Sequence, residues 1–106
     1  MESKLSDFLN SGKDWEKKAT SIPGIFVVKM PPFRNMPDRL AVELNPVNSE
    51  GRPTKKRGIL INSFEELNNF KTILNDEKLI NLLRNIDSIN PKMMKREDIR
   101  EDVIEI

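Results

Sequence analysis

Apolar residues recur at helical spacing near the start of the chain. The residues that share this face are Leu5, Phe8, Leu9, Trp15 and Ala19. Their three- and four-residue spacing predicts a helix over about residues 3–20. Gly12 interrupts the pattern and costs about 1 kcal/mol in a helix interior, so two short helices are the alternative. Pro23-Gly24 is typical of a turn and ends the segment.

Three short runs of β-branched and other apolar residues follow, over residues 25–30, 40–44 and 58–62. Pro31-Pro32 stops the first run. The second run alternates, with Leu40, Val42 and Leu44 on one face. The third is continuously apolar, as in a strand that is covered on both sides. These runs predict a small antiparallel sheet of about three strands.

A further helical pattern begins after the third run. Ser63 and Glu66 have the spacing of a capping box, in which each side chain accepts from the other residue's amide. The apolar positions behind it are Leu67, Phe70, Ile73 and Leu74, then Leu79, Leu82, Leu83, Ile86 and Ile89. Residues 75–77 interrupt them and Pro91 ends them, which predicts either one kinked helix or a helix pair.

The element order is therefore helix, about three strands, then helix or helix pair, which defines an α+β fold. We expect one domain over residues 1–91 and a charged, acidic-ended tail over residues 92–106. So small a sheet needs cover for its apolar faces. We therefore expect a homodimer in which a second subunit supplies sheet edge or helix packing.

The composition argues against catalysis. The chain has no Cys and no His, so the thiolate nucleophile, the commonest general base and the usual zinc ligands are missing. We expect no enzymatic activity, no metal and no cofactor. No apolar run approaches the roughly 18 residues of a membrane span, and no hydrophobic signal core follows the N-terminus. We expect a cytoplasmic protein without membrane contact.

Charge is unevenly distributed along the chain, although the net charge is only +1. Residues 29–57 hold seven basic against three acidic residues, whereas residues 97–106 hold five acidic residues against one basic. The basic residues that are candidates for binding phosphates are Lys29, Arg34, Arg39, Arg52, Lys55, Lys56 and Arg57. The alternative is a solvated hairpin whose cations keep a sheet edge soluble.

Two aromatic residues stand next to cations. Phe33 precedes Arg34 in a loop bounded by prolines, and Trp15 lies among three lysines. Binders of single strands combine basic grooves with rings on which bases stack, so both residues are candidates for stacking. Core packing is the alternative for each.

Two further features favour a protein partner. The apolar stripe between Leu79 and Ile89 has spacing that resembles a coiled-coil seam, although it would equally serve to cover the sheet. The acidic tail at residues 97–106 would either compete with nucleic acid or dock on a partner, or it is disordered.

The stretch from Leu40 to about Ile89 resembles the positive-cofactor-four family of transcription coactivators. In that family an acidic-Gly turn, a basic Pro-containing segment and a Gly-Ile strand lead into a helix. The matching segments here are 49–51, 52–57, 58–61 and the helix from Ser63. The resemblance implies a dimer that grips unpaired DNA in basic channels, with Arg52, Lys55, Lys56 and Arg57 as backbone contacts. The chain departs from that family at Pro31-Pro32 and at Leu67, where the family tends to carry an aromatic residue.

The chain length, the missing Cys and His and the N-terminal helical segment are similar to the ThermoDBP family of archaeal, thermophilic single-stranded DNA-binding proteins. The sequence as a whole thus predicts a homodimer that binds single-stranded DNA, or RNA, with little sequence preference. The alternative is a protein-interaction module, such as a transcription or replication accessory factor.

Overall fold

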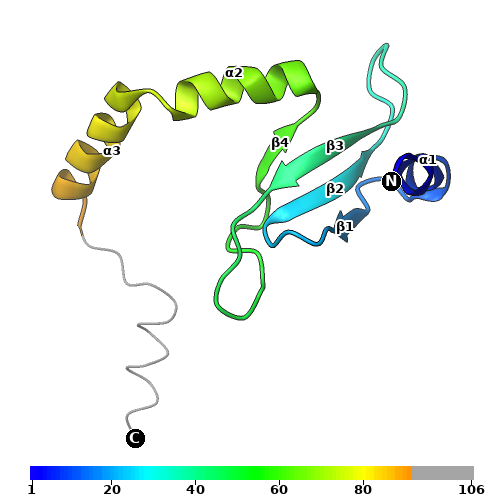
Figure 1. The fold of residues 1–106 in the computed structure, drawn as a ribbon, viewed down its shortest axis with the longest axis horizontal. Helices are drawn as coiled ribbons and strands as arrows, with labels where there is room; N and C mark the ends of the chain where they lie inside the picture. The colour runs from blue at the N-terminus through cyan, green and yellow to red at the C-terminus, as the bar shows by residue number, and fades with distance from the viewer. Residues whose placement is uncertain (92–106) are drawn as a thin grey trace, which may run out of the picture. The chain divides into compact units, whose positions relative to one another are not determined.

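In the computed structural model, which describes residues 1–91, a helix, a four-stranded sheet and two further helices follow one another (Figure 1). They are α1 (Glu2–Ser11), β1 (Lys17–Ala19), β2 (Ile25–Met30), β3 (Arg39–Leu44), β4 (Ile59–Ile61), α2 (Phe64–Leu74) and α3 (Glu77–Ile89). The α+β class, the N-terminal helix and the helix pair are confirmed. No helix within the described residues is long and apolar enough to cross a membrane. The predicted tail lies outside the described residues.

The chain divides into two compact units, and the division falls inside α2. The first unit, Met1–Phe70, contains α1, the sheet and the start of α2, and the second begins at Lys71 and contains α3. The single domain predicted over residues 1–91 stays a prediction.

The first helix is shorter than predicted, because α1 ends at Ser11 and Gly12 continues in extended backbone with φ −69° and ψ 152°. Residues 17–19, predicted as helix, instead form β1 and pair with β2. The edge of β2 offers these residues backbone hydrogen bonds, and this tertiary pairing overrides the weak helical spacing beyond Gly12. The sheet therefore has four strands.

The sheet is an antiparallel meander in the order β1-β2-β3-β4. The longest pairing joins β2 and β3, with Val27 opposite Val42 and Met30 opposite Arg39. The short β4 pairs only with β3 and is an edge strand. In β4, Ile61 is buried and Leu60 half-buried, but Ile59 is 47% exposed, so the strand predicted as covered on both sides is covered only in part.

Residues that pair across an antiparallel register share a face of the sheet, which defines two faces here. The apolar face comprises Ile25, Val27, Leu40, Val42, Leu44, Ile59 and Ile61, together with two lysines, Lys18 in β1 and the buried Lys29 in β2. The charged face comprises Lys17, Ala19, Phe26, Val28, Met30, Arg39, Ala41, Glu43 and Leu60. The buried core cluster of Val28, Met30 and Ala41 lies on the charged face.

The helix α2 begins with most of the predicted capping box. The Glu66 amide donates to Ser63 Oγ at 3.1 Å, as predicted. The Glu66 carboxylate, however, accepts from the amide of Asn62 at 3.1 Å rather than from that of Ser63. Asp76 caps α3 by accepting from the Lys78 amide at 2.8 Å.

Candidate nucleic-acid interface

A buried carboxylate organises the charged face. Glu43 is 6% exposed, and its Oε2 atom accepts from Lys17 Nζ at 3.0 Å, from Asn45 Nδ2 at 3.0 Å and from the Gly58 amide at 3.2 Å. Burial alone raises the pKa of the Glu43 carboxyl, but the hydrogen bonds from Asn45, Lys17 and Gly58 outweigh it and lower the pKa. The carboxylate thus ties β1 and the start of β4 to β3.

Asn45 follows β3 and fixes the basic loop, which we define as residues 52–57. Asn45 is fully buried. Its Oδ1 accepts from the Lys55 amide at 3.2 Å, and its Nδ2 donates to the Lys55 carbonyl at 2.8 Å. Its own amide donates to the Gly24 carbonyl at 2.8 Å. One buried amide side chain therefore holds the backbone of Lys55 against the sheet while the lysine itself remains exposed.

The ends of the basic loop are also held. The Pro46 carbonyl accepts from the Thr54 amide at 2.8 Å and from Thr54 Oγ1 at 2.9 Å. At the other end Gly58 passes so close to β3 that a Cβ atom there would lie 2.1 Å from the Leu44 carbonyl oxygen. The connection between β3 and β4 is consequently a pinned structure with outward-facing cations.

Trp15 lies in the turn between α1 and β1 rather than on a helix face. Its backbone has φ 66°, a left-handed conformation that costs of order 1–3 kcal/mol for such a residue. Its amide donates to the Lys29 carbonyl at 2.7 Å, and the Lys29 amide donates to the Glu16 carbonyl at 2.9 Å. These bonds hold the indole half exposed, with the Arg57 guanidinium carbon 5.5 Å from the ring centroid.

A hollow of about 230 Å³ lies at this point on the charged face. Val28 and Leu60 supply apolar lining, Trp15 supplies an aromatic ring, and Lys56 and Arg57 supply two cations. Lys17 lines the hollow as well, but its ammonium is paired with the Glu43 carboxylate, which is also part of the lining. Segments that are about 40 residues apart in sequence thus meet here. A cationic hollow with an exposed ring is suited to an anion that carries a flat, stackable group.

The other predicted residues are placed differently. Lys29 is 3% exposed, and its Nζ donates to Asp38 Oδ2 at 2.8 Å and to the Leu9 carbonyl. The hydrogen bond from Lys29 and its positive charge lower the pKa of Asp38. The Lys29 ammonium is already paired and enclosed, so the prediction that Lys29 contacts phosphate does not fit the structure.

Phe33 and Arg34 lie in the connection between β2 and β3, outside the hollow. Two backbone hydrogen bonds of 3.0 and 2.9 Å between Phe33 and Met36 close a tight turn, in which Arg34 has φ 55°. Phe33 is 59% exposed, and its ring lies 5.1 Å from the Arg34 guanidinium carbon. This pair is a second exposed ring beside a cation.

Two arginines complete the set. Arg39 lies on the charged face, where its Nε and Nη1 atoms are buried and have no hydrogen-bond partner among the described residues. Its hydrogen-bonding capacity is therefore partly unused. Arg52 is exposed, and its Nε lies 3.9 Å from a Glu50 carboxylate oxygen, which offsets its charge.

The residues that sequence reasoning missed are Lys17, Glu43 and Asn45. Lys17 falls within the segment predicted as a helix. No local pattern reveals that the Glu43 side chain, on the charged face, is buried. The sequence signal for Asn45 is its place between a strand and Pro46, where Asn commonly bonds to nearby backbone. Among the described residues no group of acidic side chains gathers in a way that would hold a metal ion.

Comparison of the chain with protein families, curated proteins and solved structures found no match. The two family resemblances noted above stay predictions.

Proposed function

We propose that the charged face binds single-stranded nucleic acid, with single-stranded DNA as the first candidate, and with little sequence preference. The observation that carries this proposal is Trp15. A half-exposed indole is held in a strained turn by a 2.7 Å backbone hydrogen bond, with the Arg57 guanidinium over its ring and the exposed Lys56 at the same hollow.

Stacking is the first part of the proposed mechanism. Every base has a flat π-face, so an exposed ring accepts any base and contributes about 1–3 kcal/mol per base. The bases of a duplex are already stacked on each other, so an indole at a surface hollow favours unpaired bases. Arg57 lies on the indole, where its planar group would stack on a neighbouring base or contact the phosphate beside it.

Phosphate contact is the second part. Lys55, Lys56 and Arg57 belong to a loop whose backbone is pinned through Asn45. A pinned loop loses little conformational entropy when it binds, so its cations are preorganised for a polyanion. Such contacts position the strand without reading its sequence, which supports weak sequence preference.

The test is to replace Lys55, Lys56 and Arg57 together by Ala and to measure binding of a dye-labelled single strand by anisotropy over a salt series. If all three contact phosphates, the slope of log affinity against log salt should fall by roughly 2, since each contact contributes about 0.7. The matched control replaces three exposed lysines elsewhere, Lys4, Lys71 and Lys78, and should keep most of the slope.

A second variant separates stacking from charge. Trp15→Ala should weaken binding about 5- to 150-fold, the equivalent of 1–3 kcal/mol, and leave the salt slope unchanged. Trp15→Phe should recover part of the loss. Duplex DNA should bind more weakly than the single strand, and a matched RNA strand decides between the two nucleic acids. Parental affinity and slope in both variants would refute the proposal.

A further inference from the structure

The apolar face of the sheet is left open, although it is the more hydrophobic of the two. Along β3, Ala41 and Glu43 on the charged face are buried, whereas Leu40, Val42 and Leu44 on the apolar face are only half-buried. Burial of apolar surface is the main force that stabilises a fold. Ile61 and Lys29 on the apolar side are buried, but the β3 leucines remain partly in water, so this side lacks a complete cover.

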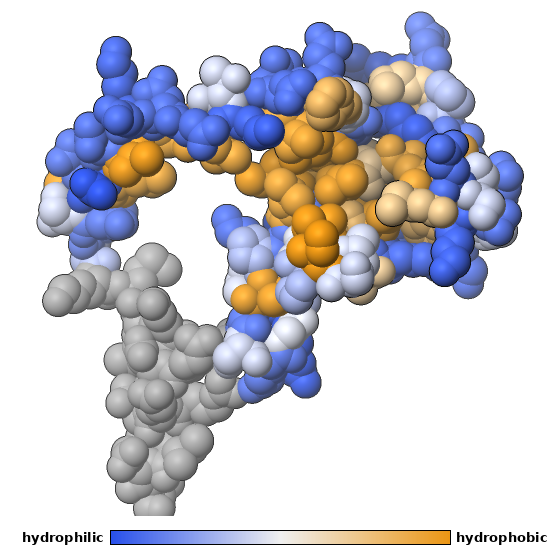
Figure 2. Space-filling view, in the orientation of Figure 1, coloured by the Kyte–Doolittle hydropathy of each residue, from blue (hydrophilic) through white to orange (hydrophobic). Residues whose placement is uncertain are grey.

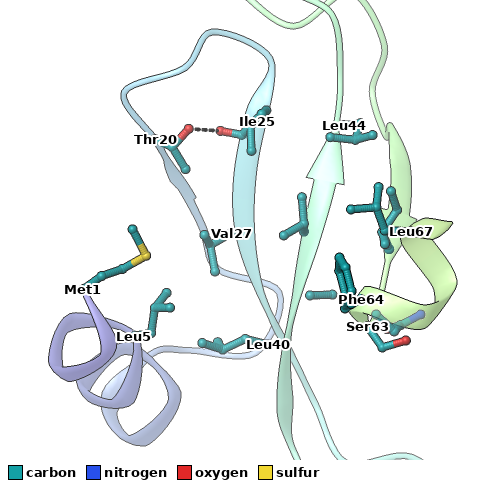
Figure 3. Close-up of a pocket in the computed structure, with 14 residues that line it drawn as sticks. Met1, Leu5, Thr20, Ile25, Val27, Leu40, Leu44, Ser63, Phe64 and Leu67 are labelled. Carbon is teal, nitrogen blue, oxygen red and sulfur yellow. Dashed lines mark hydrogen bonds between the residues drawn. The ribbon is translucent and has the colours of Figure 1, made fainter. Parts of the chain in front are cut away.

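The open area is a hollow of about 680 Å³ between α1 and the start of α2. Met1, just before α1, and Leu5 in α1 line one side, Phe64 and Leu67 from α2 line the other, and strand residues such as Val27 and Leu40 form the floor (Figure 3). Figure 2 shows apolar side chains gathered over the part of the molecule where Figure 1 draws the strands. Phe64 is 77% exposed, so the rim also presents apolar surface to solvent.

The helix α3 presents a matching surface. Its apolar stripe, which we define as Leu79, Leu82, Leu83, Ile86 and Ile89, follows the three- and four-residue spacing of one helix face. Leu82 is 55%, Leu83 51% and Ile89 80% exposed, and α3 has no buried residue. The opposite side of α3 carries polar residues such as Asn81 and Arg84. An amphipathic helix of this kind requires an apolar partner.

We propose that a second copy of this chain covers the apolar face by laying its α3 stripe into the hollow, while its own hollow receives the first chain's α3. The two surfaces are alike in chemistry, and one two-fold axis satisfies both at once, as an isologous dimer requires. A different protein or a small apolar ligand in the hollow would leave the α3 stripe exposed. A second copy leaves neither surface open.

The size of the two surfaces suits a stable dimer. With 13 residues, α3 is about 20 Å long. A helix of that length on a sheet removes several hundred Å² from each partner, so two symmetric contacts total on the order of the 1,600 Å² of a standard interface. The charged face lies on the other side of the sheet and would stay free in both copies, so the dimer and nucleic-acid binding are separable.

The test measures the mass of the full chain at micromolar concentration by light scattering or sedimentation. The stripe variant is Leu82→Glu with Ile86→Glu, and the hollow variant is Phe64→Glu with Leu67→Glu. We expect the parent to have the mass of two chains and each variant the mass of one. The control Asn81→Glu, on the polar side of α3, should keep the mass of two. The stripe variant changes side chains that are 55% (Leu82) and 37% (Ile86) exposed, and α3 has no buried residue, so circular dichroism and its melting curve should show a folded chain.

Mixing the two variants gives the decisive result. A mixed pair keeps one intact contact, because the stripe of the hollow variant fits the hollow of the stripe variant. A two-chain species should therefore reappear in a 1:1 mixture, with weaker association than in the parent. A mixture that stays at one chain would overturn the proposal. So would a parent of one chain, as expected if α3 covers its own sheet, or a hollow variant that keeps two chains, as expected if two α3 helices pair.

Discussion

In β3 the face that carries a charged residue is the more buried one, and the face that carries only apolar residues is the more exposed, which is the reverse of most sheets. On one face a carboxylate with three hydrogen-bond donors is buried with Ala41, and on the other Leu40, Val42 and Leu44 remain half-exposed. The charged face is largely complete within one chain, because Glu43, Lys17 and Asn45 satisfy one another and the pinned loop lies beside them, although Arg39 keeps buried nitrogen atoms without a partner among the described residues. The apolar face is incomplete, because it has no partner of its own kind. The comparison shows that burial alone does not identify a protein's interaction surfaces, and that the chemistry of what is left exposed is the better guide.

The largest effect on the charged face should come from Gly58→Ala. The new Cβ atom would lie 2.1 Å from the Leu44 carbonyl oxygen and 2.8 Å from Asn45 Cβ, so the backbone of β4 must move. We expect a loss of about 3 kcal/mol or more in unfolding free energy by urea denaturation. Gly51→Ala is the control, because nothing lies within 4 Å of a Cβ atom there. The only cost we expect in this control is that of placing an alanine at φ 82°, which is about 1–2 kcal/mol of unfolding free energy. Equal losses in the two variants would contradict this account.

A matched pair of core truncations tests the contrast between the faces directly. Met30→Ala, on the buried charged face, should cost about 2–5 kcal/mol at any protein concentration. Leu40→Ala, in the hollow of the apolar face, should cost less in dilute solution, because its side chain is already half-exposed. Its cost should rise with protein concentration if a second copy covers the hollow. A cost for Leu40→Ala that is large and independent of concentration would mean that the chain covers its own apolar face.

The smallest of these effects is the pH dependence set by Glu43. Its pKa is lower in the folded chain than the ordinary value of about 4.3, so its contribution to stability is fully present above that pH. The contribution is lost as the pH falls through the lowered pKa, and Asp38 acts in the same direction. Glu43→Gln should cost about 1–2 kcal/mol at neutral pH and flatten the loss of stability on acidification. Melting curves between pH 7 and pH 2 measure both, and a variant as steep as the parent would be inconsistent with this role.

Sequence patterns predicted β2, β3 and α2 well because each has a strong local signal. The Ile25–Met30 run is bounded by Gly24 and Pro31, and Ser63 opens α2 as the capping spacing requires. They missed β1 because three residues of mixed polarity become a strand only when the edge of β2 is present. Propensity carries no information about such long-range pairing.

The candidate site was predicted in part. The basic loop was recognised from its charges alone, and Trp15 from its lysine neighbours, but their meeting around one hollow depends on the meander. Lys29 was included on charge, and its enclosure beside Asp38 could not be read from sequence because alternation does not say which face is covered. Glu43 was missed for the same reason, and Asn45 because its bonds to Lys55 join residues ten apart in the chain.

The turn that holds Trp15 also gives the protein an optical property. Trp15 is the only tryptophan, and the chain contains no tyrosine. Near-ultraviolet emission therefore originates from a single half-exposed indole under a guanidinium. Emission reports on the first unit alone, whereas far-ultraviolet circular dichroism also records α3 in the second. The two signals, followed through one denaturation, would reveal whether the two units unfold together or in sequence.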